Sequence, residues 1–592
     1  MKAGRILVAA ATAATMASAG AEAPQPGLGG LWSAKLRFGP DVEGPLLLIH
    51  GSDGWRGDIA GFSVPAKESD GLFELALPDG KGAFRGRRSG TRIVGQWIQE
   101  RSATGGTAYA TPLTLVSDGP ARWRGEVRPL AETFTYYMPL SPEEKGYAAY
   151  LRNPERNQGR AFRAKRLELE GTEARLYGGG SGLQQAERLI ASGSYRADRQ
   201  TLTLPLRGAS FDFARADEAS SPFYPRGRQG ERYRYRPPPR LADGWPVASV
   251  EEVGISREAI EKLVQMLIDM PMRDVETLQL HSLLIARHGK LVVEEYFHGY
   301  HRDVPHDIRS AGKSLTSTLI GAAIQAGLPL SEEMPVYETM VGTLPQDIDP
   351  RKRAMTLRHL MTMTSGHFCD DTNPEAPGNE NVMQEQEAER DWYKYILTLP
   401  MDRRPGEKII YCSADAVLAG GLVRKVAREP LADLIHRLVT GPLEMGPYHL
   451  NLTPTGEAYT AGGGYFRPRD FLKLPQLMLN GGVWKGKRIL SRSWVEKARS
   501  PRYRLNPSQQ FGYFWNIADY PYRGRNVRAT FAAGNGGQIF MEIPELDLVV
   551  GFTGGSYNDP SALIPQRQLV PEHILPAVVE SGAKRASPAS RR

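Results

Sequence analysis

The sequence predicts an all-β N-terminal domain, a barrel or a sandwich, followed by a larger α+β domain. Between Trp32 and Tyr235, short apolar or alternating runs are separated by turns such as Pro78-Asp79-Gly80, a pattern typical of strands. Past the prolines at 237–239, apolar residues recur at helical spacing and helices alternate with strands. The 63 glycines and 44 prolines among 592 residues also favour a turn-rich protein over a helical array.

The N-terminal strands are expected at a series of short apolar runs. Leu46–His50 is continuous and Leu72–Leu77 partly alternates, and further runs follow the turn at 83–87 and 91–98. Four tryptophans spread through this region could fill the interior of a barrel: Trp32, Trp55, Trp97 and Trp123. Gly30-Leu31-Trp32 is similar to the opening of lipocalins, and this resemblance implies a lipocalin-like barrel.

Changes in composition set the domain boundaries. Arg226–Pro246 is rich in Arg, Tyr and Pro, and consecutive prolines favour an extended segment that cannot lie inside a packed helix. We therefore expect a signal peptide at 1–19, an all-β domain at 24–235, a Pro-rich linker at 236–246, an α+β domain at 247–578 and a basic disordered tail at 579–592.

The N-terminus predicts export to the periplasm or secretion. Lys2 and Arg5 precede the largely apolar stretch Ile6–Ala19, and Ala17-Ser18-Ala19 supplies a small-x-small cleavage site, which is the order of a signal peptide. The stretch is too short to span a bilayer comfortably, and no later segment approaches 18 uninterrupted apolar residues, so we expect no transmembrane anchor.

The charge balance argues against nucleic-acid binding. Lys and Arg number 74 and Asp and Glu 66, a net charge of +8 that is mild for this length. No interior run of Lys and Arg gathers this charge into a stripe that could follow phosphates. We expect no nucleic-acid partner.

The α+β domain begins with three readable elements. Ser256 can cap a helix whose apolar residues are Ala259, Ile260, Leu263, Met266 and Leu267. Two buried strands, 283–286 and 291–294, flank the turn His288-Gly289-Lys290 and predict a hairpin. Another apolar helix is expected from Leu315 to Ala326.

Ser310 and Lys313 are the sharpest candidates for catalysis. They lie at the start of that helix, where a separation of three residues puts both side chains on one face. A desolvated lysine can take the proton of a serine hydroxyl, and a helix N-terminus favours the negative charge that develops on the oxygen. The alternative is that Ser310 only caps the helix and Lys313 is exposed.

Two later motifs and one intervening stretch decide between these readings. Tyr411-Cys412-Ser413 precedes a predicted helix at 414–423, and Asn535-Gly536-Gly537-Gln538 precedes a predicted strand at 539–543. The stretch at 357–366 reads Leu-Arg-His-Leu-Met-Thr-Met-Thr-Ser-Gly. With these motifs in this order, residues 245–575 resemble the serine β-lactamase superfamily, in particular the class C β-lactamases, D-alanyl-D-alanine carboxypeptidases and related esterases and amide hydrolases. The resemblance implies a β-lactamase-like domain with a shell of helices around an antiparallel sheet.

The resemblance implies a serine hydrolase that acts through an acyl-enzyme and needs no cofactor. Ser310 would be the acylated nucleophile and Lys313 its proton acceptor, and Tyr411 would share proton transfer because a neighbouring ammonium favours an ionised phenol. The backbone N–H groups of Ser310 and Gln538 would form the oxyanion hole. We expect a small-molecule or peptide-like ester or amide as substrate.

The resemblance also implies substrate-binding positions. Ser413 would hydrogen-bond Lys313 or substrate, with a helix cap as the alternative, and Gly536 and Gly537 would let the substrate backbone approach closely. Asn535 is neutral where β-lactamases carry a cation that holds the substrate carboxylate, and a charge-assisted hydrogen bond contributes about 1.5–3 kcal/mol. This departure favours an esterase, amidase or peptidase. A carboxypeptidase or β-lactamase-like activity and a penicillin-recognising sensor without turnover remain alternatives.

The remaining candidates are given structural roles. Only two cysteines occur, Cys369 and Cys412, which excludes a disulfide scaffold and any Cys-rich metal site. In an exported protein they are expected to pair, with two buried free thiols as the alternative. Four histidines could suggest a metal site but are expected to lie at the surface or to pack: His288, His298, His301 and His306. Four carboxylates are expected to be solvated, with a Ca²⁺ site as the alternative: Asp370, Asp371, Glu375 and Glu380. The β-domain is expected to shape access to the active site or to bind a cell-envelope polymer.

Overall fold

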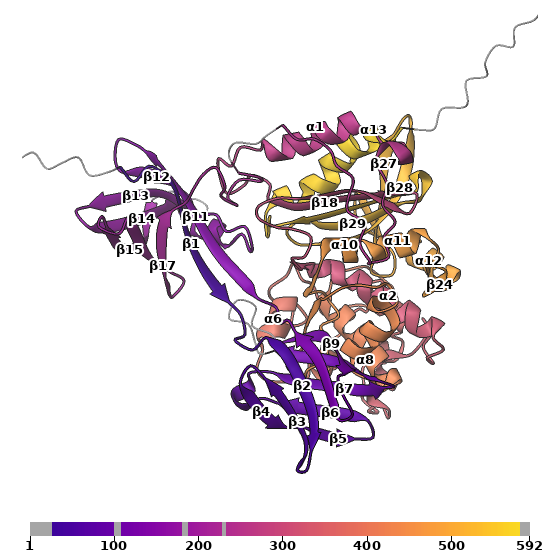
Figure 1. Cartoon of the computed structure of the whole chain (residues 1–592). Helices are drawn as coiled ribbons and strands as arrows, with labels where there is room; N and C mark the ends of the chain where they lie inside the picture. The colour runs from indigo at the N-terminus through magenta and orange to yellow at the C-terminus, as the bar shows by residue number, and fades with distance from the viewer. Residues whose placement is uncertain (1–26, 100–107, 180–186, 228–231, 580–592) are drawn as a thin grey trace, which may run out of the picture.

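The computed structural model describes residues 27–99, 108–179, 187–227 and 232–579, which form three parts. Figure 1 shows a β-barrel at the upper left, a curled β-sheet at the bottom, and a larger part of helices around a sheet on the right. The expected signal peptide at 1–19 and all but the first residue of the tail at 579–592 lie outside the described residues.

The barrel closes because its first strand pairs on both sides. β1 is hydrogen-bonded to β11 along its length and to β17 at Trp32 and Ser33, which completes a ring of eight strands. Trp32 is fully buried, its indole N–H donates to the carbonyl of Leu28 (2.7 Å), and the Arg215 guanidinium lies 4.9 Å from its ring centroid. The expectation of an all-β N-terminal barrel is therefore confirmed. Its strands are β1 (Gly30–Phe38), β11 (Glu132–Pro142), β12 (Tyr147–Ala149), β13 (Ala164–Glu170), β14 (Glu173–Gly179), β15 (Glu187–Arg196), β16 (Thr201–Leu206) and β17 (Ala209–Arg215).

The chain between β1 and β11 forms a second, curled sheet with its own core. Trp97 and Trp123 are buried in this core and Trp55 packs against it, whereas Trp32 lies in the barrel, so the four tryptophans fill two interiors and not one. Both interiors are built from the same alternating pattern, which is why the sequence does not separate them. The strand order is β4-β3-β2-β10-β9-β8-β7-β6-β5. The bounds are β2 (Gly44–Gly51), β3 (Gly54–Ile59), β4 (Phe62–Pro65), β5 (Lys67–Ser69), β6 (Leu72–Ala76), β7 (Ala83–Ser89), β8 (Arg92–Gln99), β9 (Tyr109–Ser117) and β10 (Arg122–Val127).

The curled sheet continues into the C-terminal part of the chain. β9 pairs with β21 (His449–Asn451), β21 with β22 (Gly464–Phe466), and β22 with β20 (His306–Asp307). In this register Ala110 lies opposite Leu450, and Tyr465 lies opposite both His449 and Asp307. Because β20 ends three residues before Ser310, backbone hydrogen bonds connect the N-terminal sheet to the segment that holds this serine.

The C-terminal part is an eight-stranded antiparallel sheet with helices on both faces. Its order is β19-β18-β30-β29-β28-β27-β26-β25, and Figure 1 shows α1 and α13 on one face and α10 and α11 on the other. The predicted hairpin is confirmed as β18 and β19, and Ser256 caps α1 by accepting a hydrogen bond from the N–H of Ala259 (3.2 Å). The strands are β18 (Leu280–Arg287), β19 (Lys290–Tyr296), β25 (Tyr503–Asn506), β26 (Gln509–Phe511), β27 (Asn516–Tyr522), β28 (Arg525–Gly534), β29 (Gln538–Ile543) and β30 (Leu548–Gly554).

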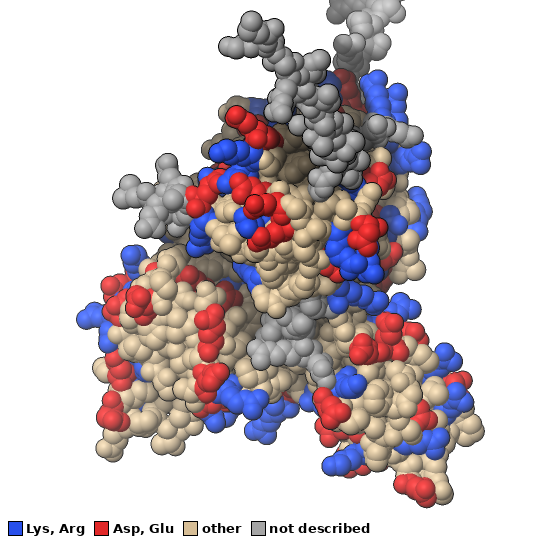
Figure 2. Space-filling view, turned by 90° about the vertical axis from the view of Figure 1, so that its left-hand side faces the viewer, with Lys and Arg blue, Asp and Glu red and all other residues tan. Residues whose placement is uncertain are grey.

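The helices of this part pack mainly around α2 and α8, which are buried over most of their length. None of the helices in the described ranges is both long and apolar enough to cross a membrane. On the face drawn in Figure 2, basic and acidic side chains are interspersed. The helices are α1 (Arg257–Ile268), α2 (Gly312–Gln325), α3 (Val336–Val341), α4 (Pro350–Arg353), α5 (Leu357–Met361), α6 (Glu380–Glu385), α7 (Trp392–Thr398), α8 (Ser413–Ala427), α9 (Leu431–Ile435), α10 (Pro468–Phe471), α11 (Lys473–Leu479), α12 (Arg492–Ala498) and α13 (Leu575–Ala577); β23 (Val483–Trp484) and β24 (Lys487–Arg488) form a small hairpin.

The Pro-rich segment expected as a linker packs against the C-terminal part. Tyr235, just before it, is buried and donates from its hydroxyl to the carbonyl of Val292 (2.7 Å). Near its end, the buried indole of Trp245 donates to the carbonyl of Arg469 (2.9 Å). These contacts fix the segment to the domain that follows.

Arg156 joins the barrel to the C-terminal part through a buried ion-pair network. Its guanidinium donates to Glu132 on β11 (2.6 Å) and to Asp307 on β20 (2.6 Å), and all three side chains are at most 13% exposed. Asp307 also accepts from the backbone N–H of Arg309 (3.0 Å). One guanidinium therefore forms ion pairs with two buried carboxylates, one on each part of the molecule.

We predict that Arg156→Gln lowers the free energy of unfolding by about 3 kcal/mol, because it removes the guanidinium that two buried carboxylates share. Urea unfolding of the full chain measures this loss. Arg175→Gln is the matched control: Arg175 pairs with Glu173 and Glu170 on the barrel surface, where an exposed pair contributes about 0–1 kcal/mol. Equal effects of the two substitutions would contradict the prediction.

Candidate active site

Ser310 lies in a single helical turn, η4 (Arg309–Ala311), that leads into α2. Its side chain is partly exposed. Gly462 packs directly against this turn: a Cβ at Gly462 would lie 2.6 Å from the carbonyl oxygen of Arg309 and 3.1 Å from the nitrogen of Ser310. With a φ of +145°, this position requires glycine for both space and backbone conformation.

Lys313 lies one helical turn after Ser310 and points back at it. Its side chain is buried, with the residue 2% exposed, and the ammonium donates to Ser310 Oγ (3.1 Å) and to the carbonyl of Ala461 (2.7 Å). The ring centroid of Tyr411 lies 5.0 Å from Lys313 Nζ. The structure therefore brings together the three side chains that the sequence predicted as catalytic.

The charge of Lys313 differs from the sequence-based expectation. Burial acts to lower its pKa, but Tyr411, Glu380 and Asp371 outweigh burial and hold the pKa of the Lys313 ammonium above its usual value. Lys313 is therefore protonated at neutral pH and not a neutral amine ready to accept a proton. Desolvation, the effect on which the sequence argument relied, is the largest single influence on this pKa, but the neighbouring groups together outweigh it.

Ser413 has a different partner from the one expected. Its hydroxyl donates to Asp371 Oδ2 (2.7 Å), and its backbone N–H donates to the same oxygen (2.9 Å). The residue is fully buried, so it is placed neither on Lys313 nor at a surface where substrate could reach it. Asp371 instead caps the start of α8, and its own N–H donates to the carbonyl of Tyr411 (3.0 Å).

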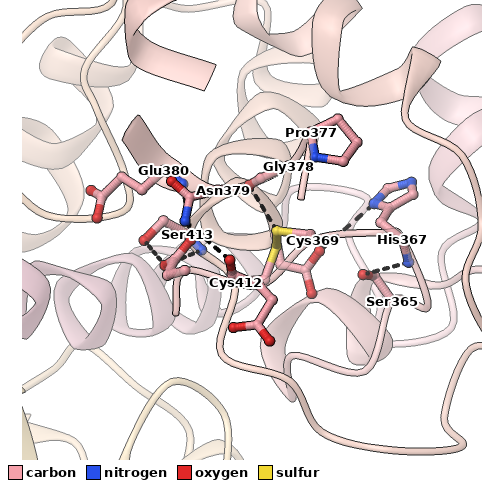
Figure 3. The surroundings of a disulfide bond; sticks show 12 residues. Ser365, His367, Cys369, Pro377, Gly378, Asn379, Glu380, Cys412 and Ser413 are labelled. Atoms are coloured by element: carbon pink, nitrogen blue, oxygen red, sulfur yellow. Dashed lines mark hydrogen bonds and ion pairs between the residues drawn. A yellow bond between two sulfur atoms is a disulfide. The ribbon is translucent and has the colours of Figure 1, made fainter. Parts of the chain in front are cut away.

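A disulfide between Cys369 and Cys412 holds the Asp371 loop against the start of α8. The two Cα atoms are 5.6 Å apart. Figure 3 shows this bond with Asn379 and Ser413 to one side and His367 to the other. Cys412 directly follows Tyr411, and Cys369 lies two residues before Asp371. The bond therefore limits how far Tyr411 and Asp371 can move apart.

Asp371 is a partly buried carboxylate that was expected on a solvated loop. Burial raises its pKa to about 6, although Lys313 and the hydrogen bonds from Ser413 act in the opposite direction. Glu380, the first residue of α6, accepts a hydrogen bond from the hydroxyl of Tyr459. Both carboxylates act electrostatically on Lys313.

The residues Asn535, Gly536 and Gly537 form the turn between β28 and β29, and the strand begins at Gln538. The exposed Asn535 amide donates to Asn558 Oδ1 (2.7 Å) and accepts from the Asn558 N–H (2.9 Å). Gly536 and Gly537 have φ values of +95° and +96°, which favour glycine.

This turn lies beside η4. A Cβ at Gly534, the last residue of β28, would be 2.4 Å from the carbonyl oxygen of Ile308. At the other end of the turn, Gln538 begins β29. Its buried side chain donates to the carbonyl of Gly554 (2.7 Å). Both backbone segments expected to form the oxyanion hole are thus packed in the same region.

Sequence reasoning missed the segment Ala461-Gly462-Gly463. It supplies the carbonyl that binds Lys313 and the glycine that packs on Ser310. A signal is present in the sequence, since Gly462-Gly463-Gly464 is a run of three glycines followed by aromatic residues.

The histidines divide into surface and core residues. His288 lies at the surface beside Asp547 (Nδ1 to Oδ2, 2.8 Å) and His301 is exposed. His298 and His306 are buried with His281, whose Nδ1 lies 2.8 Å from His306 Nε2. In the part of the chain that the structure describes, no three His, Cys, Asp or Glu side chains gather as a metal site would require.

Comparison with known proteins shows which families and proteins this part of the chain is similar to. Residues 278–562 match the family model described as Beta-lactamase. The 6-aminohexanoate-dimer hydrolase of Paenarthrobacter ureafaciens is 25% identical over 268 residues, which cover 43% of this chain and 67% of that protein. An uncharacterized protein of Mycobacterium tuberculosis is 25% identical over 187 residues, 26% of this chain and 46%, less than half, of that protein.

Solved structures with a similar arrangement are more distant in sequence. EstCE1, a hydrolase with promiscuous acyltransferase activity, is 17% identical with a TM-score of 0.43, covering 54% of this chain and 97% of its own. A penicillin-binding protein from Bacillus halodurans is 16% identical with a TM-score of 0.39, covering 49% of this chain and 96% of its own.

We predict that Asp371→Asn changes stability in a pH-dependent way. The folded pKa of about 6 lies above the unfolded value near 3.9, so the folded state holds a proton that the unfolded state has lost, and the wild type loses stability as the pH rises through this window. Relative to the wild type, the variant should therefore gain on the order of 2–3 kcal/mol between pH 4 and pH 7.5, measured by urea unfolding.

Asp217→Asn serves as the control for that measurement. Hydrogen bonds from Ser220 and Ala219 lower the pKa of Asp217, so its stability contribution is present above the unfolded pKa and is lost only at lower pH. Its difference from the wild type should stay flat between pH 5 and pH 7.5. A flat difference for Asp371→Asn as well would contradict the assignment of a partly buried, raised-pKa carboxyl.

Proposed function

We propose that the protein is an exported serine hydrolase that cleaves an ester or amide bond through an acyl-enzyme. The match of residues 278–562 to the family model described as Beta-lactamase supports this proposal. The observation that carries the proposal is the contact of 3.1 Å between Lys313 Nζ and the partly exposed Ser310 hydroxyl, beside Tyr411. This arrangement combines a reachable nucleophile with a buried charge that can activate it.

In the proposed reaction, Tyr411 is the proton acceptor and Lys313 supports it. A positive charge beside a phenol stabilises the negative charge left when the phenol has lost its proton. Lys313 donates to Ser310 Oγ, which leaves the hydroxyl proton of Ser310 free to point at another acceptor. The reacting form carries Tyr411 as its anion, with the phenolic proton already lost to solvent. Ser310 Oγ attacks the substrate carbonyl carbon while its proton passes to the Tyr411 oxygen.

The tetrahedral intermediate then collapses and the acyl group is released by water. Its oxyanion would accept hydrogen bonds from the backbone N–H groups of Ser310 and Gln538, where fixed donors stabilise developing charge. Tyr411 returns the proton to the leaving alcohol or amine, and Ser310 is left acylated. Water attacks the acyl carbon, Tyr411 accepts one of its protons, and this proton restores the Ser310 hydroxyl as the acid product leaves.

The substrate class rests on Asn535. This residue is neutral and its amide is engaged with Asn558, so it offers no positive charge to a substrate carboxylate. We therefore place esters and amides ahead of β-lactams and of peptides recognised by a terminal carboxylate.

Two further features support the remaining parts of the proposal. The Cys369–Cys412 disulfide favours an oxidising compartment, in keeping with the signal-like N-terminus. Pairing of β9 with β21 supports a role for the curled sheet in shaping the site, because β21 and β22 flank the segment at 461–463 that touches Lys313 and Ser310.

Labelling with a fluorophosphonate tests the nucleophile. We expect one probe per wild-type molecule by intact-protein mass spectrometry, together with many turnovers of a p-nitrophenyl ester. Ser310→Ala should abolish labelling and lower turnover by about 10³-fold or more. Ser317→Ala should leave both unchanged, because it removes from α2 a buried hydroxyl that has no hydrogen-bond partner among the described residues.

Two results would overturn the proposal. Labelling that persists in Ser310→Ala would place the nucleophile elsewhere. A stable adduct with the ester and no turnover would indicate a protein that traps its ligand, and would remove hydrolysis from its function.

A further inference from the structure

A cavity of about 250 Å³ lies where the barrel meets the C-terminal part. Its walls come from β11, from the segment at 154–156 and from the segment at 298–307, and Ser310, Lys313 and Tyr411 are not among its lining residues. The cavity is therefore lined by residues other than the three candidate catalytic side chains.

Glu155 is the lining carboxylate whose charge no cation neutralises directly. The other two, Glu132 and Asp307, each form an ion pair of 2.6 Å with Arg156. Within the described ranges, no Lys, Arg or His forms an ion pair with Glu155, although the charge of Lys35 at the rim acts on it from a distance. A carboxylate withdrawn from water without a counter-ion is costly, so a cation entering the cavity would be attracted to it.

The hydrogen bonds of Glu155 hold it in place without neutralising it. Its carboxylate accepts from the hydroxyl and N–H of Thr135 (2.8 and 3.2 Å), from the amide of Asn153 (2.7 Å) and from the hydroxyl of Thr133 (3.4 Å). All four donors are neutral. Burial raises the pKa of the Glu155 carboxyl, and these hydrogen bonds offset burial only in part.

Aromatic side chains complete the lining. Tyr137 on β11 and Tyr300 from the opposite wall border the cavity, and Tyr300 is stacked on His281 with centroids 4.0 Å apart. The faces of aromatic rings attract cations, and carboxylates and rings together select organic ammonium groups over anions and neutral molecules.

We propose that this cavity binds a small organic ammonium compound, with its charged nitrogen at Glu155 and its carbon substituents against Tyr137 and Tyr300. The site is independent of the proposed hydrolase chemistry. It also borders Asp307, which accepts a hydrogen bond from Arg309, the residue before Ser310.

Isothermal titration calorimetry on the full chain with a matched set of probes tests the proposal. Tetramethylammonium and butylammonium should bind, whereas the neutral butanol and the anionic butyrate should bind at least 10-fold more weakly. Binding should persist in the Ser310→Ala variant, which separates this site from the candidate active site. Equal or tighter binding of butanol or butyrate, or no binding of either cation, would overturn the proposal.

Substitutions locate the cation without relying on one variant. Glu155→Gln keeps the shape but removes the charge and should weaken tetramethylammonium binding at least 10-fold. Glu170→Gln, at an exposed position on β13, is the control and should bind as the wild type does. If Glu155→Gln does not fold, Tyr300→Leu provides the test and should weaken tetramethylammonium binding several-fold. Wild-type affinity in both Glu155→Gln and Tyr300→Leu would place the cation elsewhere and contradict the assignment.

Discussion

A positive charge buried on Lys313 is the constraint on which the candidate site depends. An ammonium withdrawn from water has to be hydrogen-bonded and electrostatically balanced, or it loses its proton. Here the hydroxyl of Ser310 and the carbonyl of Ala461 accept its hydrogen bonds, and Tyr411 and two nearby carboxylates keep it charged. These partners come from segments far apart in the chain, so the site forms only when those segments are brought together.

The rest of the molecule can be understood as the means of holding those segments. Ala461 lies between β21 and β22, and β21 is a strand of the sheet that β9 continues from the N-terminal region. Tyr411 is fixed by the adjacent disulfide and by its contact with Asp371. Arg156 connects the barrel to Asp307, just before Ser310. The N-terminal region is thus joined structurally to the site and is more than an appended domain.

The parts predicted from sequence are those that depend on local spacing. Ser310 and Lys313 are three residues apart on one helix, and the cap of α1 by Ser256 is equally local. The barrel closure pairs Gly30 with Leu140, and the alternation of apolar residues does not specify which distant strand is the partner. The capping of Ser413 by Asp371 and the charge of Lys313 also depend on contacts across long sequence separations, which is why the sequence argument assigned both differently.

Lys313→Met tests whether the charge of Lys313 activates Ser310. We predict that fluorophosphonate labelling slows by about 10²–10⁴-fold while the chain remains folded, because methionine fills the space without the charge. Lys473→Met is the matched control, since Lys473 is equally buried but pairs with Asp470 away from the site, and its labelling rate per folded molecule should stay within about twofold of the wild type. Labelling of a folded Lys313→Met variant at the wild-type rate would contradict the account.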